Sequence, residues 1–112
     1  MTMCIFCKIV AGEIPSKKAY EDDKVLAFYD INPLAPIHIL VIPKEHIRSA
    51  AGINETNEAL AGHMIAAAAK IANELGISDY RLISNIGPTA GQTVEHFHIH
   101  LIGGVDMSKR ML

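Results

Sequence analysis

A chain of 112 residues is long enough to bury the core of one domain, and we expect a single domain over residues 1–112. Half of the residues are hydrophobic and 20% are charged, which excludes a long disordered chain. Twelve acidic and ten basic residues leave a formal net charge of −2, which argues against nucleic acid as the main partner. The charge is compatible with a small nucleotide ligand.

No apolar stretch reaches the roughly 20 residues of a membrane span, and the first four residues lack the charged and apolar regions of a secretory signal. Two cysteines, Cys4 and Cys7, are too few for a small secreted disulfide scaffold. We therefore expect a cytoplasmic protein with no membrane partner and no nucleic-acid partner, whose cysteines are reduced or bind a metal.

The first half of the chain predicts one short helix and three strands. Residues 4–11 are mostly apolar and end at Gly12, as at the C-terminus of a helix. Three short apolar runs with turn residues between them have the length and composition of strands, and they cover residues 19–21, 25–29 and 38–42. Residues 30–36 contain two prolines, which predict a loop.

The second half predicts one long helix and two further strands. Residues 55–75 carry apolar side chains at helical spacing, and Gly76 follows where a C-terminal glycine belongs. The predicted core face of this helix consists of Leu60, Met64, Ala67, Ala68, Ile71 and Leu75. Residues 80–86 and 95–102 predict strands, with a polar loop between them. The sum is an α+β domain, in which helices cover one face of a five-stranded antiparallel sheet.

The last predicted strand carries histidines at alternate positions. Because side chains of a strand alternate between its faces, His96, His98 and His100 are expected to share one face, spaced by roughly 6.5–7 Å. Imidazole is a common zinc ligand, so the row could hold one ion. One imidazole could instead attack phosphorus, because a pKa of about 6.5 leaves it neutral and nucleophilic at physiological pH. The spacing alone does not choose between these chemistries.

Gly91, Gln92 and Thr93 lie just before the histidine row. They offer unhindered backbone N–H groups, an amide and a hydroxyl, which together suit a phosphate. An ordinary connecting loop is the alternative interpretation.

At these residues the sequence resembles the histidine triad (HIT) family, whose hallmark is His-x-His-x-His followed by two apolar residues. The match covers residues 96–102 and continues with Gly103-Gly104. The likeness extends over most of the chain, through the runs at residues 14–15, 20–23, 26–31, 35–38 and 41–46. The Gly-Gly ending and the N-terminal run are similar to the Hint branch, the purine nucleoside phosphoramidases.

The resemblance implies a HIT-like fold, a five-stranded antiparallel sheet with one long and one short helix. It also implies a nucleotide hydrolase or transferase that cleaves the α-phosphate bond of purine nucleoside phosphoramidates (AMP or GMP joined to an amine) without a catalytic cofactor. His98 would be the nucleophile that forms a nucleotidyl-histidine intermediate, and His100 would contact the α-phosphate. His96 would support the row with His38 as its partner, and Thr93 would lie near the leaving group.

Further roles follow from the same resemblance. Asp30 would accept both ribose hydroxyls, as suits an acceptor-only side chain. The phosphate site would be lined by Asn85, Gly91 and Gln92. The apolar walls around the base would be Ile5, Phe6, Ile14, Phe28 and Ile31, for which plain core packing is the alternative. The family also implies a homodimer whose two sheets join into one.

The Cys4-x-x-Cys7 pair has three interpretations. A redox pair would follow a strand and open a helix, but only three residues precede Cys4, so we discount it. A zinc site needs two more ligands, for which His46 and His96 are the candidates. Some relatives hold structural zinc through such a set, and the second nitrogen of His96 would then meet His38. The third interpretation is two free cysteines in a short helix.

Three functions are therefore open, of which we favour phosphoramidate hydrolysis through His98. A metallohydrolase would bind zinc through the three histidines of the row. A nucleotide-binding protein with vestigial catalysis would not need a nucleophile, so the complete row argues against it. Within the family, dinucleoside polyphosphate hydrolysis is the alternative activity.

Overall fold

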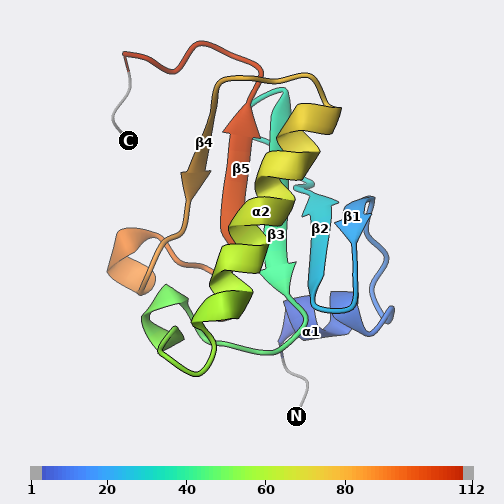
Figure 1. The fold of residues 1–112 in the computed structure, drawn as a ribbon, viewed down its shortest axis with the longest axis vertical. Helices are drawn as coiled ribbons and strands as arrows, with labels where there is room; N and C mark the ends of the chain where they lie inside the picture. Colours follow the sequence, from blue (N-terminus) through green and yellow to red (C-terminus); the bar gives the residue numbers. More distant parts are fainter. Residues whose placement is uncertain (1–3, 110–112) are drawn as a thin grey trace.

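The computed structural model describes residues 4–109 and contains one antiparallel sheet (Figure 1). The strand order is β1-β2-β3-β5-β4, and every neighbouring pair is antiparallel. The strands are β1 (Lys18–Glu21), β2 (Val25–Tyr29), β3 (Ile37–Pro43), β4 (Tyr80–Ile83) and β5 (Ile99–Gly103). The helices are α1 (Ile5–Val10) and α2 (Glu58–Glu74), with short 3-10 turns at Ala50–Gly52 and Pro88–Ala90.

The two helices lie on opposite faces of the sheet, so the expectation that helices cover one face is wrong. One buried cluster joins α2 to alternate residues of the central strands, among them Ala27 and Val41. A second cluster joins Phe6 of α1 to the residues that point the other way, among them Leu26 and Leu40. The physical reason is that β2 and β3 are apolar at consecutive positions, and a sheet that is apolar on both faces needs cover on both.

The long helix begins at Glu58 rather than at residue 55. Asn54 and its neighbours form side-chain bonds to the backbone instead of a helical turn. The N–H of Asn54 donates to Asn57 Oδ1 at 2.7 Å, and the N–H of Thr56 donates to Asn54 Oδ1 at 2.9 Å. Such local bonds compete with the helix, which explains the later start. None of the helices within residues 4–109 is long and apolar enough to cross a membrane.

The ladder between β4 and β5 is also shorter than the sequence predicts. The strand β5 begins at Ile99 rather than at residue 95, because the N–H of Phe97 donates to Ile47 O at 2.6 Å, beyond the end of β3. The strand β4 ends at Ile83, where the Ser84 hydroxyl donates to His98 O at 2.7 Å. The segment before β5 is therefore held by the backbone of Ile47 and by the side chain of Ser84 instead of by strand pairing.

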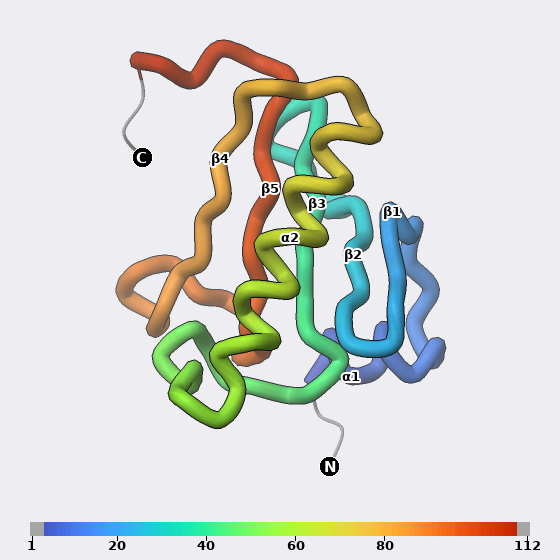
Figure 2. Tube along the Cα trace, viewed as in Figure 1, coloured from blue at the N-terminus to red at the C-terminus, as the bar shows by residue number. Residues whose placement is uncertain are grey.

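The end of β5 packs against the loop between β2 and β3. Gly104 has φ +87°, and a Cβ built there would lie 3.1 Å from Pro36 Cβ, so only glycine fits comfortably. Beyond this point the chain turns away from β5 and passes the beginning of β4, as the trace in Figure 2 shows. Gly104 thus allows Pro36, the last residue of the loop at residues 30–36, to pack against the end of β5.

Candidate functional site

The histidines gather on the face of the sheet that α1 covers. His96 and His98 both meet the ring of Phe6 edge-on, with centroid distances of 5.8 and 5.2 Å, and the rings of His98 and His100 lie 5.0 Å apart. Phe97 belongs to the apolar cluster on the opposite, α2 side. The alternation of faces therefore extends through residues 96–98, although these residues precede the hydrogen-bonded strand.

His98 is buried and has one fixed ring nitrogen. Its Nδ1 lies 2.7 Å from the backbone oxygen of His96. A carbonyl oxygen only accepts hydrogen bonds, so Nδ1 carries the proton in this contact and Nε2 of the neutral ring keeps its lone pair. The ring is 5% exposed and its edge contact with Phe6 restricts rotation. The arrangement presents one unprotonated imidazole nitrogen.

His38 contacts His100, whereas the family resemblance implied a contact with His96. His38 Nε2 lies 2.9 Å from His100 Nδ1. The backbone N–H of Leu34 donates to the other His38 nitrogen, Nδ1, at 3.1 Å. Burial lowers the pKa of His38, and burial together with the neighbouring His98 lowers the pKa of His100 to about 4. Both rings are therefore neutral at physiological pH.

The carboxylate of Asp30 lies beside this histidine pair. Its Oδ2 is 3.5 Å from His38 Nε2, and its Oδ1 accepts the N–H of Asn32 at 2.8 Å. Asp30 follows the last residue of β2 and remains 20% exposed at its side chain. One carboxylate oxygen is therefore turned toward the histidines at the rim of the site.

A second cluster joins α1 to the segments around the histidine row. Its ligand atoms come from Cys4, Cys7, His46 and His96, and all four lie within 4.8 Å of one another. The Nδ1 of His96 lies 3.3 Å from Cys4 Sγ, 3.6 Å from Cys7 Sγ and 3.2 Å from His46 Nδ1. Tetrahedral zinc separates such nitrogen and sulfur ligands by roughly 3.3–3.8 Å. The donor set and the spacing thus fit zinc.

His96 is oriented for this cluster by a backbone group. Its Nε2 lies 2.8 Å from Pro43 O and must donate there, which leaves the Nδ1 lone pair for a metal. The expected contact of this second nitrogen with His38 is therefore wrong. Burial lowers the pKa of His96, which favours the neutral form that binds metals. Phe6 separates this cluster from the first by packing against both His96 and His98.

Comparisons with known proteins agree with these motifs. A family model described as "Scavenger mRNA decapping enzyme C-term binding" matches residues 3–111. A HIT-like protein of Buchnera aphidicola is 47% identical over 111 residues, which cover 96% of this chain and 99% of the relative. The structure of a HIT family hydrolase from Clostridium thermocellum superposes with a TM-score of 0.97 and is 52% identical, covering 100% of this chain and 99% of its own.

The chain belongs to the HIT family. The five-stranded antiparallel sheet with one long and one short helix is thus confirmed as a HIT fold. A further relative, a protein of Zea mays that is called a 14 kDa zinc-binding protein, is 46% identical over 107 residues. It covers 93% of this chain, and this chain covers 84% of it.

The apolar positions assigned to the base divide into two groups in this HIT protein. Phe6 and Phe28 are buried, with centroids 5.5 Å apart, and Ile14 packs against the same cluster. Ile5 and Ile31 are instead 47% and 92% exposed. The first group forms a floor beneath the histidines, whereas the second presents apolar side chains to solvent.

The polar loop before the histidine row is held by the side chain of Gln92. Its Oε1 accepts the N–H of Gly87 at 2.9 Å, and its Nε2 donates to Arg48 O at 2.8 Å and to Val94 O at 3.0 Å. Both ends of the amide are therefore occupied by backbone. Asn85 lies beside Gly91, where an added Cβ would come 3.5 Å from Asn85 Nδ2.

Thr93 is exposed and lines a hollow of about 720 Å³ beside the cysteine cluster. The other residues around this hollow are Cys4, Ile5, Cys7, His46, Val94 and Glu95. The hollow thus connects the predicted leaving-group residue with the cluster that fits zinc.

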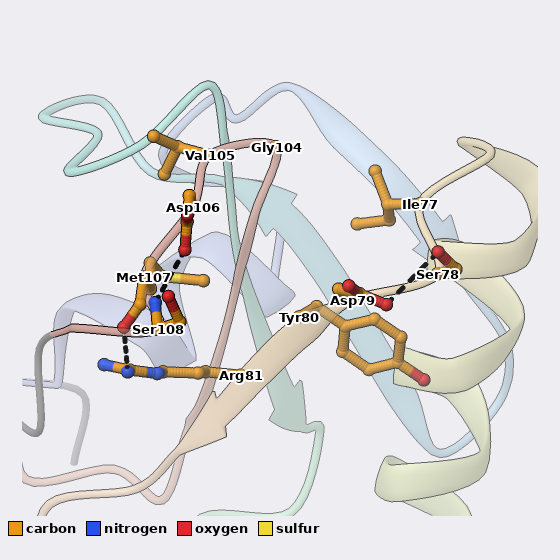
Figure 3. Close-up of a pocket in the computed structure, with 10 residues that line it drawn as sticks. All are labelled: Ile77, Ser78, Asp79, Tyr80, Arg81, Gly104, Val105, Asp106, Met107 and Ser108. Atoms are coloured by element: carbon orange, nitrogen blue, oxygen red, sulfur yellow. Dashed lines mark hydrogen bonds between the residues drawn. The ribbon is translucent and has the colours of Figure 1, made fainter.

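A second hollow of about 670 Å³, which the sequence did not indicate, lies between β4 and residues 104–108 (Figure 3). Arg81 points to the tail and donates to Met107 O at 2.6 Å, whereas Tyr80 points to the opposite side, toward α2. Arg81 shares a sheet face with the histidines, since it pairs with Ile102, which pairs with His38.

Other functional groups that the sequence did not reveal are backbone atoms, such as the N–H of Leu34 and the carbonyls of Pro43 and His96. No residue-type pattern marks them, because every residue has a carbonyl and nearly every residue has an N–H group.

Proposed function

We propose that this HIT protein hydrolyses purine nucleoside phosphoramidates at the α-phosphate through a covalent intermediate on His98. The observation that carries the proposal is the fixed ring of His98, whose Nδ1 bond to His96 O leaves Nε2 as a nucleophile. The ring of His100 lies 5.0 Å away on the same face, close enough to contact the same phosphate.

The reaction has two displacements at phosphorus. First, His98 Nε2 attacks the α-phosphorus, the P–N bond to the amine breaks, and the amine leaves after taking a proton from solvent. Water then attacks the same phosphorus, the bond to Nε2 breaks, and the nucleotide leaves while the surplus proton returns to solvent. A neutral imidazole suits both steps, because it attacks as a lone pair and leaves as a neutral ring.

Other residues of the site bind and orient the substrate in this proposal. His100 donates to a phosphate oxygen that gains charge in the transition state. Asp30, whose side chain is 20% exposed, accepts the ribose hydroxyls, and Thr93 lies near the leaving amine. Ile5 and Ile31 offer exposed apolar surface to the base, over the floor that Phe6 makes with its neighbours. Gln92 holds the loop of the phosphate site in place through its three backbone contacts.

The geometry argues against the metallohydrolase alternative. A catalytic zinc on the row would need ligand atoms of His96, His98 and His100 to converge. Within residues 4–109, His98 belongs to neither group of converging ligand atoms, and His96 points to the cysteines. His96 therefore belongs to the cysteine cluster, whereas His98 and His100 face the proposed phosphate site.

We also propose that Cys4, Cys7, His46 and His96 hold a structural zinc ion. The bound ion would supply a cross-link between the α1 region, the segment after β3 that carries His46, and the first histidine of the row. His96 would then be fixed at Nδ1 by the metal and at Nε2 by Pro43 O, and its own carbonyl orients His98. The name of the Zea mays relative and the four-ligand geometry support this assignment.

The homodimer that the family implies stays a prediction. The edge strand β4 carries Leu82, which is 38% exposed, and α2 carries Ile65, which is 51% exposed, so apolar surface is available for a partner. Sedimentation equilibrium tests it, and a monomer at micromolar concentration contradicts it.

The deciding experiment compares turnover of adenosine 5′-phosphoramidate by the wild type and by His98→Ala. We expect the variant to lose at least about a thousandfold in kcat while still binding AMP, because only the nucleophile is removed. His63→Ala is the matched control, since it removes an imidazole that lies on α2 and contacts Asp22.

Turnover should persist with a chelator in solution as long as the protein stays folded. A folded wild type that binds AMP but does not turn over the phosphoramidate contradicts the proposal and favours the binding-protein alternative. Faster cleavage of a dinucleoside polyphosphate than of the phosphoramidate favours the other branch of the family.

A further inference from the structure

The contacts of His38 determine which of its nitrogens carries the proton. A backbone N–H can only donate, so His38 Nδ1, which receives the N–H of Leu34 at 3.1 Å, must present its lone pair. Burial keeps the ring neutral, so its single proton lies on Nε2. That nitrogen faces His100 Nδ1 at 2.9 Å and donates to it.

His100 is thereby forced into the matching form. Its Nδ1 accepts the hydrogen bond that His38 Nε2–H donates, so Nδ1 carries no proton and the single proton of the ring lies on Nε2. The lowered pKa of His100 agrees with a neutral ring. Nε2 is on the side of the ring away from His38. A neutral His100 in this form is a hydrogen-bond donor there, whereas the other form would present a lone pair and repel a phosphate oxygen.

We propose that Leu34 is a positioning residue, whose backbone N–H sets the tautomers of His38 and then of His100 and so keeps His100 a donor toward the substrate phosphate. The tautomer assignment rests on hydrogen-bond geometry, and the lowered pKa values of both histidines agree with it. Only its last step, the contact with phosphate, rests on the proposed function.

The loop at residues 30–36 holds this N–H in place from both sides. At its start, the N–H of Asp30 donates to His38 O at 2.9 Å, and Asp30 Oδ1 accepts the N–H of Asn32. At its end, Pro36 packs against Gly104. The side chain of Leu34 is 79% exposed and contributes little to this anchoring. The useful part of Leu34 is therefore its backbone.

The same contacts explain why the cluster of Asp30, His38 and His100 is built for proton placement rather than for a metal. Their ligand-type atoms also lie within 4.8 Å of one another. A metal there would take the lone pair of His38 Nε2, and the proton of His38 would have to move to Nδ1. It would then point at the N–H of Leu34, so two donors would face each other.

The test reads the tautomers directly by long-range proton–nitrogen NMR of uniformly ¹⁵N-labelled protein, above the pH range in which the imidazoles titrate. We expect the ring protons of both His38 and His100 on Nε2 in the unmodified chain. In a second protein, Leu34 is replaced by its α-hydroxy analogue, which keeps the side chain and exchanges the N–H for an ester oxygen. Leu34→Ala is the matched control, because it trims the exposed side chain and keeps the N–H.

We expect the ester to move a substantial part of both ring protons to Nδ1, and Leu34→Ala to leave both on Nε2. The full loss of such a donor costs about 10²–10³ in rate, so a partial loss should lower kcat for the phosphoramidate by roughly tenfold and change KM less. The backbone amide spectrum of the rest of the chain reports whether the ester protein is folded.

Two results would overturn the proposal: a proton on Nδ1 of His38 in the unmodified chain, or unchanged tautomers in the folded ester protein. If the ester protein does not fold, the spectrum of the unmodified chain still decides the assignment. A protein with the expected tautomers but no turnover contradicts the proposed function and supports the tautomer assignment.

Discussion

At the scale of single residues, the two groups of apolar side chains around the site should respond differently to truncation. Phe6 is buried against Phe28, His96 and His98, so Phe6→Ala should lower the free energy of unfolding by about 3–5 kcal/mol. Ile31 is 92% exposed, so Ile31→Ala should change it by no more than about 0.5 kcal/mol. Urea unfolding of both variants measures these differences.

Although Ile31→Ala should hardly change stability, we expect it to weaken substrate binding. If its side chain covers the base, the lost contact is worth about 1 kcal/mol, and Ile31→Ala should raise KM for the phosphoramidate roughly fivefold with kcat unchanged. An unchanged KM would show that Ile31 is an ordinary exposed side chain. The exposure of Ile31 already excludes core packing, so this comparison decides between a wall of the base site and an ordinary surface side chain.

Residue types alone predicted which histidines share a face but not how the histidines pair. Alternation along a strand placed His98 and His100 on one face, because that inference needs only local geometry. The partner of His38 depends on the register between β3 and β5, which no local pattern contains. Leu34 and Pro43 make their contacts through backbone atoms. Other residue types at these two positions could offer the same atoms, so the residue type does not reveal the contact.

At the scale of elements, α1 should depend on the metal more than any other part of the fold. A six-residue helix is too short to be stable alone, and α1 is held by two buried side chains and by the cysteine cluster. We expect one zinc per chain by elemental analysis. Removal of the metal should speed amide hydrogen exchange in Ile5–Val10 while Glu58–Glu74 stays protected.

A matched pair of variants separates the metal from the helix itself. Cys7→Ser removes one zinc ligand, whereas Lys8→Ala changes the neighbouring residue of the same helix, which is not a ligand. Only the first should lose the metal and the protection of α1. Equal protection of α1 with and without metal would contradict the structural role.

The elements themselves were predictable where their signals are local. The apolar spacing and Gly76 located α2, and the prolines located the loop at residues 30–36. The side of the sheet on which α1 packs was not predictable, because a short helix fits either face of strands that are apolar on both. The start of β5 was missed because Ile47, far away in the sequence, takes the N–H of Phe97.

At the scale of the whole molecule, the buried histidines make stability depend on pH. The pKa of His100 is about 4 in the folded chain, against 6.5 without the fold, and burial lowers the pKa of His38 in the same direction. Between these values the unfolded chain binds a proton that the folded chain does not. The free energy of unfolding should therefore fall as the pH falls from 6.5 toward 4, and His100 adds no further change below 4.

The carboxylate of Glu21 also makes stability depend on pH, but at lower pH than the histidines, so the two effects can be measured separately. Lys18 and Lys44 contact the carboxylate of Glu21 and lower its pKa to about 2, so the stability that it contributes is lost as the pH falls from 4.5 toward 2. Measurements between pH 7 and about pH 5.5 leave Glu21 almost fully ionised in both states. The slope in that window then reports on histidines.

Urea midpoints of the wild type and of His100→Gln across this window isolate the contribution of His100. The variant removes the titrating ring, so its stability should fall less steeply with falling pH, although its absolute stability differs. The proposed zinc ligands are the same in both proteins, so any effect they have on stability cancels in the difference of slopes. Equal slopes would mean that His100 binds protons equally well in the folded and unfolded chains, and its burial would then not hold the ring neutral.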